Sequence, residues 1–173
     1  MDRFIPQADY AEDQPMSRLV LYTHTMHRGF TMGGFIGALV GVARVSKLWY
    51  TTKAQSSATV TKSLLTSRVL GSSAIGSLCG VGTLAVMTYA QMWGREQIEW
   101  QDRSWRLLHN RGQNRADRWS VVASAASAAA VLATRSTGIA QSPWKALLGT
   151  AALASLGATI AASQVPKSTA NEN

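Results

Sequence analysis

The chain has 173 residues, of which 46% are hydrophobic and only 15% charged, and its formal net charge is +8. Soluble domains usually carry about 25% charged residues. The high apolar content excludes a disordered chain, and the single cysteine, Cys79, excludes a disulfide-stapled secreted module. The charges also cluster and leave long uncharged stretches, a pattern typical of membrane proteins.

Residues 1–26 form a polar N-terminal segment of mixed charge, in which Pro6 and Pro15 are expected to break any long helix. Its acidic residues are untypical of a mitochondrial transit peptide, which is rich in arginine and poor in acids. We therefore expect any organelle targeting signal to be internal.

Four largely uncharged stretches follow, and a bilayer core of about 30 Å needs about 20 mostly apolar residues per helix. The clearest stretch has 25 uncharged residues, at positions 69–93. The sequence therefore predicts an all-α membrane protein with about four transmembrane helices packed through small residues. The membrane domain covers 27–166, with spans at about 27–46, 69–93, 119–135 and 145–165, a polar loop at 94–118, and a disordered tail at 167–173.

Four tryptophans lie at the ends of these spans. In a four-span hairpin, Trp49 and Trp144 fall on one side and Trp93 and Trp119 on the other. Tryptophans gather in this way at the two interfaces of a membrane. The alternative is a soluble helical bundle with an alanine-rich core, in which no such belts are expected. Both sides carry many basic residues, so the orientation stays open.

Small residues recur every four positions in the first two spans, and residues with this spacing share one face of a helix. In lipid, such faces allow close contact between helix backbones, which replaces the missing hydrophobic driving force. We therefore predict helix packing through Gly29, Gly33, Gly37, Gly41, Ser72, Gly76 and Gly80.

The polar loop 94–118 contains six arginines, four acidic residues and two tryptophans. We predict a helix that continues out of the second span and ends near Gly112, a residue type common after helix ends. Tryptophan and arginine often dominate binding interfaces, and basic residues beside spans attract anionic lipids. The residues predicted to bind a partner or an anionic phospholipid such as cardiolipin are Trp100, Arg103, Trp105, Arg106, Arg28 and Arg44.

Motifs of catalysis are missing from the sequence, so we predict neither enzymatic activity nor a cofactor. His24 and His27 lack cysteine or acidic companions at metal spacing, so no metal site is predicted. Cys79 is expected to be an inert packing residue. Because the arginines flank the spans, lipid is a better partner than nucleic acid. No ionisable residue is expected in mid-span, which disfavours an ion-coupled transporter.

The stretch from Arg111 to about Ser163 resembles the four-span family of mitochondrial inner-membrane import translocases, which includes an accessory subunit of respiratory complex I. The family has an acidic residue before the third span, then a small-residue span and an arginine- and glycine-containing exit. It has an arginine where this chain has Gln113. The matching residues here are Asp117, Trp119, Ser120, the run SAASAAAVLA, Thr134, Arg135, Ser136 and Gly138.

This resemblance implies a multi-pass protein of the mitochondrial inner membrane. Its expected function is that of a non-catalytic accessory subunit of complex I, the respiratory-chain enzyme of electron transport, stabilising the membrane arm and contacting membrane-arm subunits. The alternative within the family is a component of a protein-import translocase. An independent small-solute transporter is a third hypothesis, which the lack of mid-span charge disfavours.

Overall fold

The structure is a computed structural model that describes residues 6–52, 58–133 and 142–164, all as helices and short connections without a strand. The predicted all-α class is therefore confirmed for the described residues. The elements are the short 3₁₀ helix η1 (Ala11–Asp13) and the helices α1 (Ser17–Thr52), α2 (Ala58–Met92), α3 (Gln97–His109), α4 (Arg111–Ala133) and α5 (Pro143–Gln164).

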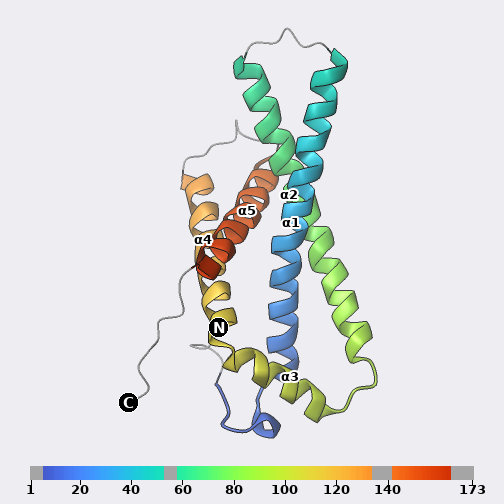
Figure 1. The fold of residues 1–173 in the computed structure, drawn as a ribbon, viewed down its shortest axis with the longest axis vertical. Coiled ribbons are helices and arrows are strands. Elements are labelled where there is room, and N and C mark those ends of the chain that lie inside the picture. Colours follow the sequence, from blue (N-terminus) through green and yellow to red (C-terminus); the bar gives the residue numbers. More distant parts are fainter. Residues whose placement is uncertain (1–5, 53–57, 134–141, 165–173) are drawn as a thin grey trace.

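The two longest helices, α1 and α2, form an antiparallel pair with the most extensive contact in the molecule. Helix α3 lies across the end of this pair where α2 finishes, and α4 runs back from there (Figure 1). Helix α5 packs against α4, α2 and α1. At their other end, α1 and α2 extend well past α4 and α5 (Figure 1).

The burial pattern is the reverse of that of a soluble protein. Many large apolar side chains are exposed, among them Leu39, Val86 and Leu132, while buried positions are occupied largely by alanine, serine, threonine and a few ionisable groups. In water, contiguous apolar surface of this kind is rare on a monomer. Apolar residues outside and small or polar residues inside are what a lipid environment favours.

Three helices are long and apolar enough to cross a membrane, within the described residues: Ser17–Thr51, Leu65–Met92 and Pro143–Gln164. This is one fewer than the four spans predicted, because α4 does not qualify. Its first two turns carry Arg111, Arg115, Asp117 and Arg118, and the rest is mostly alanine and serine, which contribute little hydropathy.

Helix α1 begins at Ser17, ten residues before the predicted start of the first span. The preceding segment is held by the side chain of Gln14, which donates to the carbonyls of Pro6 and Pro15 and accepts from the Ala8 amide. The additional residues of α1 include His24, which faces other helices and not solvent. The polar character of His24 therefore does not mark it as part of a segment that precedes the helix.

The polar loop also differs from the prediction of one continuous helix. Helix α2 ends at Met92, and Gly94, at a φ of 69°, turns the chain into α3. Asn110 then separates α3 from α4, and its side chain accepts a 3.1 Å hydrogen bond from the Gln113 amide, as a helix N-cap does. Gly112 consequently lies in the first turn of α4 and does not end a helix.

Two parts of the predicted pattern lie outside the described residues. They are the tail at 167–173 and the exit motif of the third span, Thr134, Arg135, Ser136 and Gly138.

Candidate functional site

The glycine face of α1 lies directly against α2. A Cβ atom added at Gly29 would stand 2.4 Å from the Gly80 carbonyl oxygen, and one at Gly33 would stand 2.2 Å from that of Gly76. At Gly37 the nearest atom is the carbonyl oxygen of Ser72, at 2.2 Å. Real Cβ atoms do not come this close, so the two backbones touch along the seam only because side chains are absent.

The same face continues to Gly41, where an added Cβ would lie 2.8 Å from the Cα of Val69. Helix α5 also approaches the backbone of α2 through a glycine, since a Cβ at Gly149 would stand 2.4 Å from the Leu70 carbonyl oxygen. The structure thus places all seven of the predicted helix-packing residues along the α1–α2 contact.

A polar cluster joins α1 to α4 and has Asp117 at its centre. Asp117 is only 3% exposed. Its Oδ2 atom lies 2.8 Å from Nδ1 of His24, and its Oδ1 atom lies 2.8 Å from a guanidinium nitrogen of Arg28. The Arg28 contact lacks hydrogen-bond geometry, so it neutralises the carboxylate as an ion pair. The second ring nitrogen of His24 lies 2.9 Å from Nε2 of Gln113.

A chain of hydroxyl groups continues the cluster toward α5. Nε2 of His27 lies 2.6 Å from the Ser120 hydroxyl. The Ser120 hydroxyl contacts that of Ser155, which in turn lies 2.7 Å from the Thr31 hydroxyl. Three helices, α1, α4 and α5, are therefore linked by side chains that are far apart in the sequence.

The cluster contains the serine, histidine and aspartate of a serine hydrolase, but their hydrogen bonds differ from those of a catalytic triad. In a Ser-His-Asp triad a single imidazole joins the acid to the nucleophile. Here His24 contacts Asp117 whereas His27 contacts Ser120. Ser120 is also 1% exposed, which closes it to a substrate. The arrangement pairs polar groups inside the bundle and has the geometry of a structural network.

Sequence reasoning missed this network, and it expected Asp117 at the N-terminus of the third span. The available signal was the i,i+4 spacing of His24 and Arg28, which puts both on one face of a helix, together with a lone acid beside a predicted span. A metal is not indicated either, since the described residues contain no group of three potential metal ligands.

Two of the residues predicted to bind a partner or lipid are engaged inside the molecule. Arg28 pairs with Asp117. Trp100 is 6% exposed, with its ring 6.0 Å from that of Tyr22 and the guanidinium of Arg18 5.3 Å from it. Within this chain, Trp100 is therefore a core residue that fixes α3 against α1.

The other predicted residues lie nearer the surface. Trp105 donates its indole N–H to the Ala8 carbonyl at 3.0 Å, and Arg106 forms an exposed i,i+4 pair with Asp102 at 3.0 Å. Arg103 is half-buried on α3. Arg44 lines an apolar groove of about 550 Å³ along the α1–α2 seam.

Cys79 lines the same groove and is exposed, which corrects the expectation of a buried packing thiol. It lies at the edge of the α1–α2 seam, since Gly76 and Gly80 occupy the contact itself.

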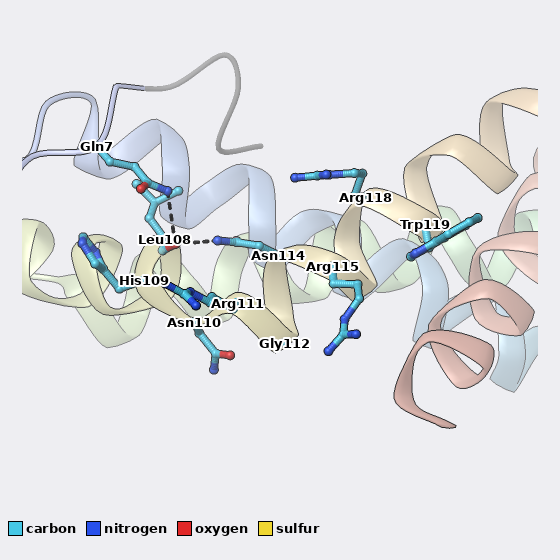
Figure 2. A pocket seen from close by; sticks show the side chains of 10 residues that line it. All are labelled: Gln7, Leu108, His109, Asn110, Arg111, Gly112, Asn114, Arg115, Arg118 and Trp119. Carbon is cyan, nitrogen blue, oxygen red and sulfur yellow. Dashed lines mark hydrogen bonds between the residues drawn. The ribbon is translucent and has the colours of Figure 1, made fainter. Parts of the chain in front are cut away.

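A second, more polar pocket lies at the corner between α3 and α4 and has a volume of about 920 Å³ (Figure 2). Its wall is fixed by the Leu108 carbonyl, which accepts from Asn114 at 2.5 Å and from Gln7 at 3.3 Å. The basic and aromatic side chains that line the pocket are His109, Arg111, Arg115, Arg118 and Trp119. Sequence reasoning singled out Trp119 but did not select His109 or the three arginines, although the arginines recur at i, i+4 and i+7.

Fold and site together define a helical protein with three apolar helices able to cross a membrane and an internal polar network. The chain belongs to the family DUF1757, described as a protein of unknown function, whose sequence profile matches residues 5–153. Comparisons with curated proteins and with solved structures find no match.

Proposed function

We propose that this chain is a multi-pass membrane protein with a structural role, namely a non-catalytic accessory subunit of the membrane arm of respiratory complex I in the mitochondrial inner membrane. The observation that carries the structural role is the burial of the polar network around Asp117 and Ser120. Asp117, Ser120 and Ser155 are each no more than 3% exposed, and each contacts polar side chains of another helix. Such a network holds helices together and offers no surface to a substrate.

The contacts also support a fourth crossing by α4. His24 and His27 of α1 contact Asp117 and Ser120 in the same order, so α1 and α4 run in parallel. Helix α5 is antiparallel to α4, since Ser155 lies beside Ser120, whereas the earlier Ala151 accepts from the later Ser124. If α1, α2 and α5 cross a membrane, the chain must return between α2 and α5, and α4 is the helix that does so.

Helix α4 is suited to this return although its composition is not strongly apolar. Its 23 residues span about 34 Å at 1.5 Å per residue, which is long enough to reach from the headgroup level, where its charged first turns would lie, through most of a bilayer core of about 30 Å. Its polar residues Asn114, Asp117 and Ser120 are buried, while Val121 and Val122 are exposed. From Trp119 onward the helix therefore turns apolar side chains outward, while Ser120 faces the bundle.

The assignment to complex I rests on the resemblance of the third span to the translocase-like family. The motif residues Asp117 and Ser120 support it, because they join three helices in a rigid unit and do not open toward a channel. A scaffold subunit needs such a unit and an apolar outer surface for neighbouring subunits and lipid. The import translocase remains the alternative within the same resemblance.

Native gel electrophoresis tests this proposal. The full chain carrying an affinity tag is expressed in cells of its source, and the mitochondrial membranes are solubilised with a mild detergent. We expect the tagged chain to comigrate with NADH dehydrogenase activity. Comigration with a protein-import channel would replace the proposal by its alternative, and absence from mitochondria would overturn both. Carbonate extraction at high pH provides the control for membrane integration, and the chain should stay in the membrane pellet.

The outward face of α3 provides a sharper version of the same experiment. Its inner face is occupied by the N-terminal segment, through Gln101 with the Glu12 carbonyl and Trp105 with the Ala8 carbonyl. Arg103→Ala with Arg106→Ala changes the outer side of the helix without touching those contacts. Loss of comigration with retained membrane integration would place the subunit interface on α3. A matched control is Lys47→Ala with Arg68→Ala, which removes the same charge from exposed positions of α1 and α2 far from α3.

A further inference from the structure

We infer that the pocket between α3 and α4 binds the phosphate of an anionic phospholipid headgroup. The site is distinct from the buried network, because none of the network's side chains lines it. It also differs from the lipid-binding residues that the sequence suggested. The inference does not depend on which complex the chain joins.

The first step of the argument is charge. Three arginines, Arg111, Arg115 and Arg118, line the pocket, and none of its ten lining residues is acidic. Residues four and seven positions apart lie on one face of a helix, and the three arginines project from two successive turns of α4 around the pocket (Figure 2). Arginine presents a planar fork of N–H donors that matches phosphate oxygens. The pocket is thus complementary to an anion with several oxygens.

The second step is position along α4. Beyond the arginines the helix is uncharged from Trp119 to Ala133. Trp119 lines the pocket and is 58% exposed, and tryptophans with exposed rings are typical of the headgroup level of a membrane. The arginines therefore lie within about two turns outside the level at which the apolar stretch begins, where lipid phosphates are found.

The third step is continuity of the surface. Arg115, Trp119 and Val122 are spaced four and three residues apart and share one face of α4. Val122 is 55% exposed, so this face passes from basic to aromatic to apolar without interruption. A lipid whose phosphate contacts Arg115 can lay an acyl chain along Val122. A free phosphate or an acidic peptide would use only the basic end, which favours a lipid as the occupant.

The backbone around the pocket is held in place by hydrogen bonds. The Leu108 carbonyl in its wall accepts hydrogen bonds from Asn114 and Gln7, and the Asn110 cap fixes the start of α4. The arginine backbones are therefore positioned before a ligand arrives, which reduces the ordering cost of binding.

Thermal unfolding of the purified full chain in mild-detergent micelles tests the inference. Dioleoyl-phosphatidylglycerol is titrated and compared with dioleoyl-phosphatidylcholine and with soluble glycerol phosphate. We expect saturable stabilisation by phosphatidylglycerol only. Arg111→Gln with Arg115→Gln should weaken its apparent affinity about thirtyfold, since each of the two basic residues near an anionic lipid contributes on the order of 1 kcal/mol and about 1.4 kcal/mol corresponds to tenfold.

The matched control is Lys47→Gln with Arg68→Gln, which removes the same charge from exposed positions of α1 and α2 outside the pocket and should bind as the wild type does. Equal loss in both variants, or no loss in either, would overturn the site. Equal stabilisation by glycerol phosphate would show that the ligand is soluble and would overturn the assignment of a lipid.

Circular dichroism of each variant establishes that its helices are intact. Arg115→Lys keeps the charge, and partial retention of affinity would support the arginine–phosphate contact even if the double variant unfolds.

Discussion

Two seams hold this helical bundle together, and they work by different physics. Between α1 and α2 the contact is made of backbone, with Gly29, Gly33 and Gly37 admitting the opposing helix so closely that no side chain fits. Between α1, α4 and α5 the contact is made of side chains, with Asp117 at its centre. In lipid the hydrophobic effect does not drive helices together, so packing and hydrogen bonding must do so.

The comparison teaches that the two seams tolerate change differently. The glycine seam is sensitive to any added volume, however apolar. The polar seam accepts changes of volume more readily but is sensitive to the loss of one partner, which leaves a buried charge uncompensated. The following predictions, measured by unfolding of the full chain in detergent micelles, separate these sensitivities.

The largest effect is expected for Asp117→Ala. The substitution leaves Arg28 and His24 facing a void, and removing one partner of a buried ion pair typically costs about 3–5 kcal/mol. Asp117→Asn, which keeps the shape and an acceptor oxygen, should cost less. If Asp117→Ala unfolds at the same denaturant concentration as the wild type, the polar seam does not hold the bundle.

A smaller loss is expected for Gly33→Ala, because its methyl group would stand 2.2 Å from the Gly76 carbonyl oxygen and force the helices apart. Overpacking of this kind costs about 1–3 kcal/mol. Gly82→Ala is the matched control, since nothing lies within 4 Å of the added atom. There the better helix propensity of alanine should raise stability by up to about 1 kcal/mol. A gain at both positions would contradict the close approach of α1 and α2.

Ser155→Ala should cost less again. It removes the hydroxyl that joins Ser120 to Thr31, but Ser120 keeps its contact with His27, and Thr31 still donates to the His27 carbonyl. Hydrogen bonds between membrane helices are worth about 0.6 kcal/mol on average, so two of them amount to about 1 kcal/mol. Ser46→Ala, which removes a hydroxyl bonded only within its own helix, should leave the unfolding midpoint unchanged.

The smallest effect is expected for Asp102→Ala. Its partner Arg106 is 73% exposed, and such a surface pair contributes about 0–1 kcal/mol. Salt should reduce even this contribution, because it screens exposed charges. A loss of stability as large as that of Asp117→Ala would contradict the surface position of the Asp102–Arg106 pair. It would mean that this face of α3 is covered by something other than this chain's own helices. Unfolding at low and high salt measures the difference.

The contrast between the seams also explains what could be predicted. The glycine seam is local in the sequence, since residues four apart share a face in any helix, and the predicted residues Gly33 and Gly76 lie in the contact. The second span ends within one residue of its predicted end, at Met92. The polar seam joins residues 93 positions apart, such as His24 and Asp117, and no periodicity in one segment indicates such a partner.

The sequence by itself determined the helical class, the apolar stretches and the small-residue faces, because each follows from the spacing of side chains along one helix. The tertiary structure alone decided that α1 extends back to Ser17. This extension contains polar residues such as His24, which is buried in a helix because Asp117 lies opposite it. It likewise decided that Cys79 faces outward and that Trp100 faces inward, since a residue's side of a helix becomes inside or outside only through its neighbours. The basic pocket at the start of α4 exists for the same reason, because Leu108, Asn114 and Gln7 must meet before its arginines enclose a space.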